Sequence, residues 1–292
     1  MSDSKLLSVV LTSYTTKRLN DIYELLDSIK CQSYGNIEII FVTESSVELF
    51  DSIKRYAVEN EINNIKVVIN AGETGLSAAR NFGVKESHGD IVAFIDDDAI
   101  LYPDWAEQTV KSYEEESVIG ITGPAFPLWE DESMSWFPEE FYWIISCTAW
   151  TGWKQPRDVR NAWGMNMSFR REVFDSGEFF TSTFGLHNNI RSTWYDPPSE
   201  DVDLSLRVKK RTGKRIVFVP SVRIKHRVYL ERISGKFIRQ RSFSVGYQRR
   251  ILKKLFLDTN TNEDLLGQEH QLLKNIFSHL FPEIAKGFFP HP

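Results

Sequence analysis

Cysteine is scarce in this chain of 292 residues, which contains only Cys31 and Cys147. Two cysteines cannot build a disulfide framework or a four-thiolate zinc site, so a reducing, cytosolic setting fits best. The first residues, MSDSKLLSVV, include an acid and no basic region, which argues against a signal peptide. The longest apolar-leaning run, residues 141–150, is far shorter than the ~20 residues that cross a bilayer, so we expect no transmembrane segment.

A glycine-rich dinucleotide motif is also missing. No G-x-G-x-x-G sequence is present, which excludes a dinucleotide-dependent oxidoreductase of the Rossmann type. Aromatic residues are plentiful by contrast, because 20 Phe, 10 Tyr and 8 Trp can bury ample apolar surface and so exclude disorder as the main state. At roughly 100–200 residues per domain, the chain forms one large domain or two modest ones.

Charge is distributed unevenly along the chain. The net charge is −5, yet residues 207–254, here called the basic segment, contain 17 lysines or arginines and one acid, Glu231. This segment therefore carries +16 and the remaining residues carry −21. Such a segment indicates an anionic partner, such as phosphate groups, nucleic acid or an anionic membrane surface. A solvated helix face is the alternative, and composition alone favours it.

Short apolar strands alternate with amphipathic helices in the first hundred residues. Apolar runs predict strands at 8–13, 37–42, 65–69 and 91–95. Apolar residues at helical spacing predict helices at 19–29, 47–58 and 77–86. This alternation is typical of a parallel sheet covered by helices, in which ligands bind beyond the carboxyl ends of the strands.

Polar side chains follow three of these strands, at 12–14 (Thr-Ser-Tyr), 43–45 (Thr-Glu-Ser) and 96–98 (three aspartates). We expect them to converge on one crevice. Two carboxylates that flank one residue can hold a hard divalent cation such as Mg²⁺ or Mn²⁺. Acidic triplets more often mark solvated turns, but the apolar run 91–95 places this one at the ligand end of a central strand.

Three further segments carry candidate chemistry. GLSAARNFG, residues 75–83, begins a helix with small residues and contains Arg80, which could reach a phosphate or the aspartates. Glu200 and Asp201 follow a Pro-Pro-Ser helix entry, where the helix terminus favours ionised carboxylates that could accept a proton. His226 becomes a metal ligand only if it folds next to Asp98. Ordinary helix capping and a structural histidine are the alternatives for these segments.

The ordered set of motifs resembles glycosyltransferase family 2, the inverting transferases of the GT-A fold. The similarity covers residues 8 to about 226 and is carried by TSY, VTES, GLSAARNFG, FIDDD, WGMNMSFRR and PSEDVDLSLRVKKRTGKRIVFVP. It implies an α/β fold with a Rossmann-like, mostly parallel sheet and helices on both faces. We expect a catalytic domain at 1–226, with a nucleotide-binding half at about 1–120 and an acceptor-binding half at about 121–226, and a basic, amphipathic helical extension at 227–292.

The resemblance also implies site residues. Asp98 resembles the direct metal ligand, Asp96 the acid near the ribose or the metal, and His226 a residue that completes the metal site in some relatives. Asp201 matches the general base of the family, and Glu200 lies beside it. The remaining residues implied to bind the nucleotide sugar are Thr12, Tyr14, Glu44, Gly75, Arg80, Asp97, Gly164 and Asn166. Glu44 stands where the family usually has an aspartate that contacts the base.

The implied reaction is a metal-assisted single displacement, in which a sugar leaves a nucleoside diphosphate and joins a hydroxyl acceptor, either lipid-linked or glycan, with inversion. Mg²⁺ or Mn²⁺ is the implied cofactor. A sugar nucleotidylyltransferase is an alternative, but the loop after the first strand, TSYTTKR, lacks glycine. A non-catalytic carbohydrate- or membrane-binding module is another, and acids retained at all three motif sites argue against it.

The C-terminal part favours a membrane surface over a nucleic acid as the anionic partner. Basic residues crowd 232–254, and apolar residues recur at helical spacing from Leu265 to Ile284. We expect a protein at the inner face of the cell membrane, peripherally bound. The alternative is that this region packs onto the catalytic domain and its arginines bind the donor diphosphate. Six tryptophans lie within 129–163, where a helix could run from Pro138 to about Trp150. Their rings form either core or a sugar-stacking or lipid-facing acceptor surface.

Overall fold

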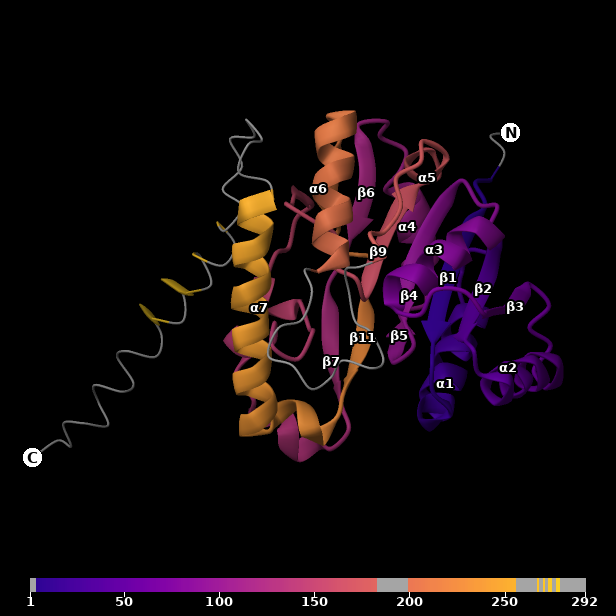
Figure 1. The fold of residues 1–292 in the computed structure, drawn as a ribbon, viewed down its shortest axis with the longest axis horizontal. Coiled ribbons are helices and arrows are strands. Elements are labelled where there is room, and N and C mark those ends of the chain that lie inside the picture. Colours follow the sequence, from indigo (N-terminus) through magenta and orange to yellow (C-terminus); the bar gives the residue numbers. More distant parts are fainter. Residues whose placement is uncertain are drawn as a thin grey trace, which may run out of the picture.

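The computed structural model describes residues 4–182 and 199–255, together with Gly267, His270, Leu273, Lys274, Phe277 and Ser278. An eight-stranded sheet runs through the molecule in the order β3-β2-β1-β4-β9-β6-β10-β8 (Figure 1). Its strands are β1 (Leu7–Ser13), β2 (Ile37–Glu44), β3 (Ile65–Asn70), β4 (Ile91–Asp96), β6 (Val118–Thr122), β8 (Arg157–Asp158), β9 (Asn166–Arg170) and β10 (Arg215–Phe218).

The sheet is mostly parallel, as expected. β1 pairs in parallel with β2 and β4, β2 with β3, and β6 with β10. β9 runs antiparallel between β4 and β6, and β8 runs antiparallel to β10 at the edge. The polar ends meet in register, because Thr12 pairs with Asp96 and Ser13 with Thr43. The three strand ends therefore meet at one edge of the sheet, and a shared crevice for their side chains stays a prediction.

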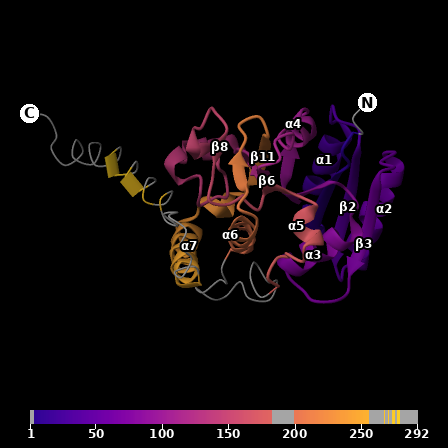
Figure 2. The ribbon, with the colours of Figure 1, turned by 90° about the horizontal axis from the view of Figure 1, so that it is seen from above.

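Helices cover both faces of this sheet, as Figure 2 shows from above. The α-helices are α1 (Leu19–Lys30), α2 (Val47–Glu59), α3 (Leu76–Glu86), α4 (Trp105–Lys111), α5 (Glu172–Asp175), α6 (Glu200–Thr212) and α7 (Gly235–Leu255). The 3₁₀ turns are η1 (Thr16–Arg18), η2 (Glu132–Trp136), η3 (Glu139–Phe141), η4 (Ala149–Thr151) and η5 (Leu230–Ile233). The helices expected in the first hundred residues are present within one residue at either end.

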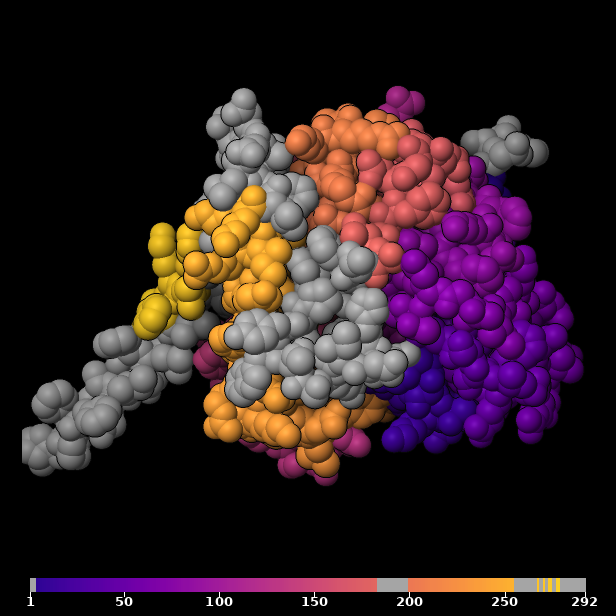
Figure 3. All heavy atoms as spheres, in the orientation of Figure 1, coloured from indigo at the N-terminus to yellow at the C-terminus, as the bar shows by residue number. Residues whose placement is uncertain are grey.

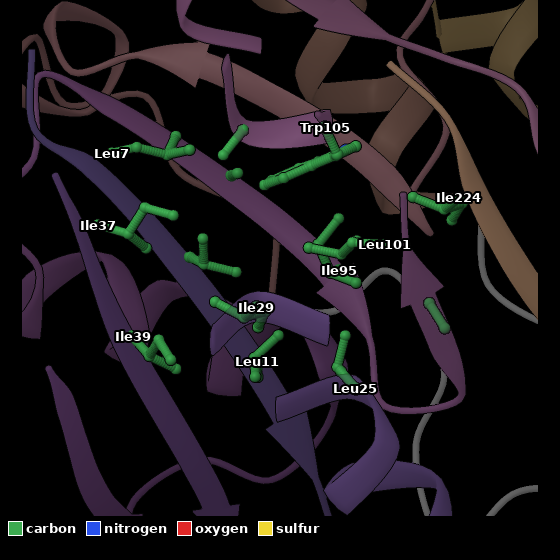
Figure 4. Close-up of a cluster of buried hydrophobic side chains, with 14 of the residues drawn as sticks. Leu7, Leu11, Leu25, Ile29, Ile37, Ile39, Ile95, Leu101, Trp105 and Ile224 are labelled. Atoms are coloured by element: carbon green, nitrogen blue, oxygen red, sulfur yellow. The ribbon is translucent and has the colours of Figure 1, made fainter. Parts of the chain in front are cut away.

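Strand alternation divides the apolar core into two layers. Alternate side chains of a strand point to opposite faces, so Leu7, Val9 and Leu11 of β1 pack with α1 and α2, while Val10 packs on the other face with α3. Figure 4 shows the first layer, in which Leu25 and Ile29 of α1 lie over Leu11 and Ile95. Because these strands are buried on both faces, their sequences read as continuous apolar runs.

A second, three-stranded sheet positions His226. It has the order β5-β11-β7, with β5 at Ala99–Leu101, β7 at Ala125–Trp129 and β11 at Ile224–Val228. β11 runs antiparallel to β5, and this pairing sets His226 opposite Ala99. The backbone N–H of Arg227 donates to the carbonyl of Asp98 at 2.9 Å. Sheet pairing therefore brings His226 to the aspartates, although 127 positions of sequence separate it from Ala99.

α7 packs beside α6 in both ribbon views and lies at the surface in Figure 3. Leu252 of α7 is buried against Val202 and Leu206 of α6. The Ser199 hydroxyl donates to Gln248 Oε1 at 2.8 Å, so α7 also contacts the residue that precedes Glu200. The expected C-terminal helix is thus present, and it lies against the helix that carries the candidate base.

The helix expected from Pro138 to Trp150 is wrong. This segment contains η3 and η4, and Ser146 has a φ of 60°, a left-handed conformation that an α-helix cannot accommodate. The amphipathic stretch expected from Leu265 to Ile284 lies outside the continuously described ranges. Within the described ranges, no helix is both long enough and apolar enough to cross a membrane.

Candidate active site

Asp96, Asp98 and His226 form a cluster that could hold a metal ion, because one ligand atom from each lies within 4.8 Å of the others. His226 Nε2 is 3.1 Å from Asp98 Oδ1 and 3.9 Å from Asp96 Oδ2. Asp98 Oδ1 is buried and accepts no hydrogen bond from the described part of the chain. A buried carboxylate oxygen that faces an imidazole without a hydrogen bond fits a shared divalent cation, and this donor set suits Mg²⁺ or Mn²⁺.

Two arginines approach the same carboxylate from different elements. Arg232 of η5 donates to Asp98 Oδ2 at 3.0 Å, and Arg18 of η1 lies 3.4 Å from that oxygen. Both guanidinium groups lie over the Tyr229 ring, 5.3 Å from its centroid for Arg18 and 5.5 Å for Arg232. Burial opposes ionisation of Asp98, but His226, Arg232 and Arg18 outweigh it and hold its pKa well below the ordinary value. Asp98 is therefore ionised, which is the form that a metal ligand requires.

Asp97 points away from this cluster into a supporting network. Its carboxylate accepts hydrogen bonds from the Ser13 hydroxyl at 2.6 Å and from Arg18 at 2.7 Å. Burial and the negative charge of Asp98 raise the pKa of Asp97 above its ordinary value. Its contacts tie the end of β1 and η1 to the aspartate turn, so they position the turn.

Arg80 of α3 connects the aspartates to α6. Its side chain is 3% exposed, and its guanidinium donates to Asp96 Oδ1 at 3.1 Å, Glu200 Oε1 at 2.7 Å and the Gly164 carbonyl at 3.0 Å. A planar guanidinium can hold three acceptors in one plane, which an ammonium cannot do. Arg80 therefore fixes the end of β4 relative to the start of α6.

Glu200 and Asp201 begin α6, but their surroundings differ. Glu200 is buried against Arg80, and burial, together with nearby Asp201 and Asp96, raises its pKa despite the arginine. Asp201 Oδ2 accepts a hydrogen bond from the Gly164 N–H at 3.0 Å, and Asp201 lines a pocket. Of the two adjacent carboxylates, Asp201 is thus the one that a bound molecule in this pocket could contact.

The residues expected to hold the nucleoside lie around the ends of β1 and β2. Thr12 is half-buried beside Asp96 in the sheet register, and Tyr14 is 41% exposed. The Gly75 N–H donates to Glu44 Oε2 at 3.2 Å, so the start of α3 is tied to the end of β2. Gly75 has a φ of 112°, which side-chain-bearing residues rarely adopt, and this explains a glycine at the start of α3.

Asn166 and Gly164 were also expected to bind the nucleotide sugar, but they lie at the start of β9 and just before it, not at the ends of β1 and β2. The Asn166 side chain is 1% exposed, accepts from Trp105 Nε1 at 3.0 Å and donates to the Val222 carbonyl at 2.8 Å, so both ends of its amide are used inside the fold. Gly164 lies between Arg80 and Asp201, and a Cβ there would be 3.4 Å from Arg80 Nη2 and 3.6 Å from Asp201 Oδ2.

A pocket of about 130 Å³ lies between the tryptophan-rich segment, the start of α6 and α7. Asp201 lines it from α6, and Trp143, Trp150 and Trp163 line it from the tryptophan-rich segment. Trp163 also packs against Trp153 and Phe218. Some of the tryptophans therefore pack against the core and others line a pocket, and a sugar-stacking role for those in the pocket stays a prediction.

A family model, Glycosyl transferase family 2, matches residues 8–177. The chain belongs to glycosyltransferase family 2. It is similar to a glucosyl-dolichyl phosphate glucuronosyltransferase of Haloferax volcanii, with 30% identity over 251 residues that make up 85% of this chain and 78% of that protein. The family and its GT-A fold agree with the resemblance in the motifs.

Solved structures of similar fold support the GT-A assignment. A mannosyltransferase from Pyrobaculum calidifontis, solved with GDP-Man and Mn²⁺, has a TM-score of 0.65 at 16% identity and aligns over 99% of this chain and 82% of its own. Residues 1–349 of S. aureus TarS, solved with UDP, have a TM-score of 0.53 at 15% identity over 88% of this chain and 73% of that one.

Several residues at the centre of this glycosyltransferase are not indicated by its sequence motifs. Arg18 lies in a loop without any recognisable pattern, and Arg232 is one of many arginines in the basic segment. Their contact with Asp98 depends on η1 and η5 meeting over Tyr229. The charge of the basic segment was the one available signal, and it identifies no single arginine.

Proposed function

We propose that this glycosyltransferase moves a sugar from a nucleoside-diphosphate sugar to a hydroxyl acceptor by a single inverting displacement. One observation carries the proposal: Arg80 and Gly164 join the Asp96–Asp98–His226 cluster to Asp201 in one continuous network. A donor held at the cluster and an acceptor held in the pocket would therefore meet across Gly164.

On the donor side, Asp96, Asp98 and His226 would hold the divalent cation. When bound, Mg²⁺ or Mn²⁺ neutralises the charge that develops on the leaving diphosphate. Arg18 and Arg232 stand beside Asp98, so their positive charge adds to the stabilisation of that diphosphate. Thr12, Tyr14, Glu44 and Gly75 surround the nucleoside side of the site.

On the acceptor side, Asp201 accepts the proton of the attacking hydroxyl. Its Oδ2 is oriented by the Gly164 N–H, and it lines the pocket that a bound acceptor would fill. Glu200 cannot exchange roles with it, because its carboxylate is buried in an ion pair with Arg80. One base and one displacement invert the anomeric centre once.

The acceptor that we propose is lipid-linked, and the enzyme acts at an anionic membrane surface. The similar Haloferax volcanii protein is named for a glucosyl-dolichyl phosphate substrate. Lys236, Arg239, Lys253 and Lys254 of α7 are exposed, and each basic residue near an anionic leaflet adds about 1 kcal/mol of attraction. We further propose 1–226 as the catalytic domain and 227–292 as an extension that completes the acceptor side.

The roles of Asp98 and Asp201 are tested by separating donor binding from transfer. Binding of GDP, UDP and dTDP is measured with Mn²⁺ or Mg²⁺, and transfer is measured with the matching sugar nucleotides. We expect Asp98→Asn to abolish metal-dependent nucleotide binding. We expect Asp201→Asn to bind donor like the parent and to lose about 10²–10⁴-fold in transfer, the usual contribution of a general base.

The matched control is Asp51→Asn, the same chemical change at an exposed position of α2. It should match the parent in both measurements. Unchanged metal-dependent affinity in Asp98→Asn would remove the metal assignment. A loss of transfer below about tenfold in Asp201→Asn would remove Asp201 from the role of base.

A further inference from the structure

We propose that the pocket between α6 and α7 is the acceptor site, and that Arg241 and Arg249 of α7 bind a phosphate group of the acceptor. The acceptor is then a glycosyl phosphate, whose sugar hydroxyl faces Asp201 and whose phosphate faces α7. This inference rests on the proposed function, because it assigns Asp201 as the base that the acceptor must reach.

The pocket has the size and position that such an acceptor needs. Its volume of about 130 Å³ is close to that of an engineered protein cavity of about 150 Å³ that binds benzene, so it suits a group of about the size of one six-membered ring. The candidate base, Asp201, is part of its lining. Arg80 contacts both Asp96 and Gly164, and Gly164 contacts Asp201, so two residues connect the lining of the pocket to the metal cluster.

The charge of the lining favours an anion. Among the described residues that line the pocket, three are arginines, Arg160, Arg241 and Arg249, and one, Asp201, carries a carboxylate. Arg160 is 9% exposed and donates from Nε to Asn161 Oδ1 at 2.9 Å, so this buried cation has a fixed orientation. Arginine is the side chain best suited to phosphate, because its planar fork makes paired, charge-assisted hydrogen bonds.

The two α7 arginines reach the pocket because they share a helix face. Arg241, Val245, Gln248 and Arg249 all line the pocket, and their spacing of four, seven and eight residues places them on one side of α7. That side is held in place, since Leu252 packs against α6 and Gln248 accepts the hydrogen bond from Ser199. Arg250, the neighbour of Arg249, is exposed and does not line the pocket.

The opposite wall is aromatic and offers a donor. Trp143 and Trp150 line it, and Trp143 Nε1 is buried without a hydrogen bond to any residue of the described ranges. Buried donors are nearly always satisfied, so this indole N–H is a hydrogen-bond donor beside the pocket without a partner in the described part of the chain. Apolar walls with a few placed polar groups are typical of sites for small organic ligands.

A substitution experiment with paired acceptors tests the assignment. The double variant Arg241→Gln/Arg249→Gln is assayed for transfer to three soluble acceptors that carry the same sugar: a short-prenyl glycosyl phosphate, the glycosyl phosphate without a lipid, and a neutral alkyl glycoside. We expect KM for both phosphate acceptors to rise about 10–100-fold, the value of one or two charge-assisted hydrogen bonds. KM for the neutral glycoside and for the donor should stay within twofold of the parent.

The matched control is Arg250→Gln, which removes a charge from the same helix outside the pocket and should match the parent with every acceptor. Trp143→Phe, which removes the indole N–H together with the five-membered ring, should raise KM for the acceptors and leave donor KM unchanged. An equal loss on phosphate and neutral acceptors, or an equal loss in Arg250→Gln, would overturn the phosphate site. Failure of the parent to turn over any sugar nucleotide would instead overturn the proposed function.

If the double variant raises KM less for the lipid-free glycosyl phosphate than for the short-prenyl one, the lipid chain helps to place the phosphate. If KM rises equally for these two acceptors, the phosphate alone is recognised. Both results support the arginine site, and they distinguish a lipid-linked acceptor from a soluble one.

Discussion

In the proposed mechanism single residues connect the donor side to the acceptor side, and Gly164 is where the two meet. Its carbonyl accepts from Arg80 and its N–H donates to Asp201, so the backbone at this position belongs to both halves of the site. A side chain at residue 164 would point between Arg80 and Asp201. Glycine is therefore useful here for the space it leaves in the site.

Gly164→Ala should lower transfer without lowering stability. The new methyl group would make only ordinary contacts, 3.4 Å from Arg80 Nη2 and 3.6 Å from Asp201 Oδ2, so the fold can accept it. It would stand where reacting groups must approach, and a misplacement of about 1 Å can cost 10²-fold in rate. We expect kcat/KM to fall about 10–100-fold while the midpoint of thermal unfolding stays unchanged. A variant with parental kcat/KM would contradict the position of Gly164 in the site.

At the residue scale the sequence predicted that the three candidate metal ligands lie together. Asp96, Asp98 and His226 were expected to meet, and sheet pairing brings them within 4.8 Å. Arg18 was not predictable, because its contact with Asp98 requires η1 to fold back over the end of β4. A carboxylate pattern next to a strand is local information, whereas the cations that balance it come from distant parts of the chain.

At the scale of elements, α3 determines where Arg80 lies. Gly83 follows Arg80 by three residues, and a Cβ on it would lie 2.4 Å from Val10 Cγ1 in β1 and 3.2 Å from Val42 Cγ2 in β2. The helix can approach the sheet this closely only because residue 83 has no side chain. The depth of Arg80 in the site therefore depends on the packing of a glycine one turn away.

Gly83→Ala should destabilise the protein and displace Arg80. Overpacking a buried site costs about 1–3 kcal/mol, and the better helix propensity of alanine returns at most about 1 kcal/mol. We expect a lower free energy of unfolding in urea and weaker transfer together. Lys85→Ala, at an exposed position of the same helix, serves as the control and should change neither. A stable Gly83→Ala variant with full activity would contradict the close packing of α3.

The elements of the first hundred residues were predictable because each has one clear period. Apolar runs marked buried strands, and the spacing of Ile22, Leu25 and Ile29 marked the buried face of α1. The segment from Pro138 to Trp150 failed for a physical reason. Its apolar residues resemble one helical face, but Ser146 takes a left-handed conformation and the chain folds into short 3₁₀ turns. Tertiary packing decides such a segment, and the sequence shows no trace of it.

For the whole molecule, the basic segment serves two purposes. Its first half is largely neutralised by acids from earlier parts of the chain: Arg227 pairs with Asp21 and Glu24, and Arg223 with Asp104. This pairing explains how a segment of +16 can fold against a chain of −21. The exposed lysines and arginines of α7 remain at the surface, and they are the part that could attract an anionic membrane.

Binding to vesicles tests this division of charge. The parent should co-sediment with vesicles that contain an anionic phospholipid at low salt, and should release them at high salt, because the attraction is screened within a Debye length of about 10 Å at 0.1 M. Replacing Lys236, Arg239, Lys253 and Lys254 by glutamine should weaken that binding at least 100-fold, since each contributes about 1 kcal/mol.

The control variant replaces four basic residues that are exposed on α2, α3 and α4, namely Lys54, Arg55, Lys85 and Lys111. It removes the same charge from the other half of the molecule and should leave vesicle binding unchanged. Equal losses in both variants would mean that net charge alone drives the association. Binding of the parent to neutral vesicles regardless of salt would contradict an electrostatic role for α7.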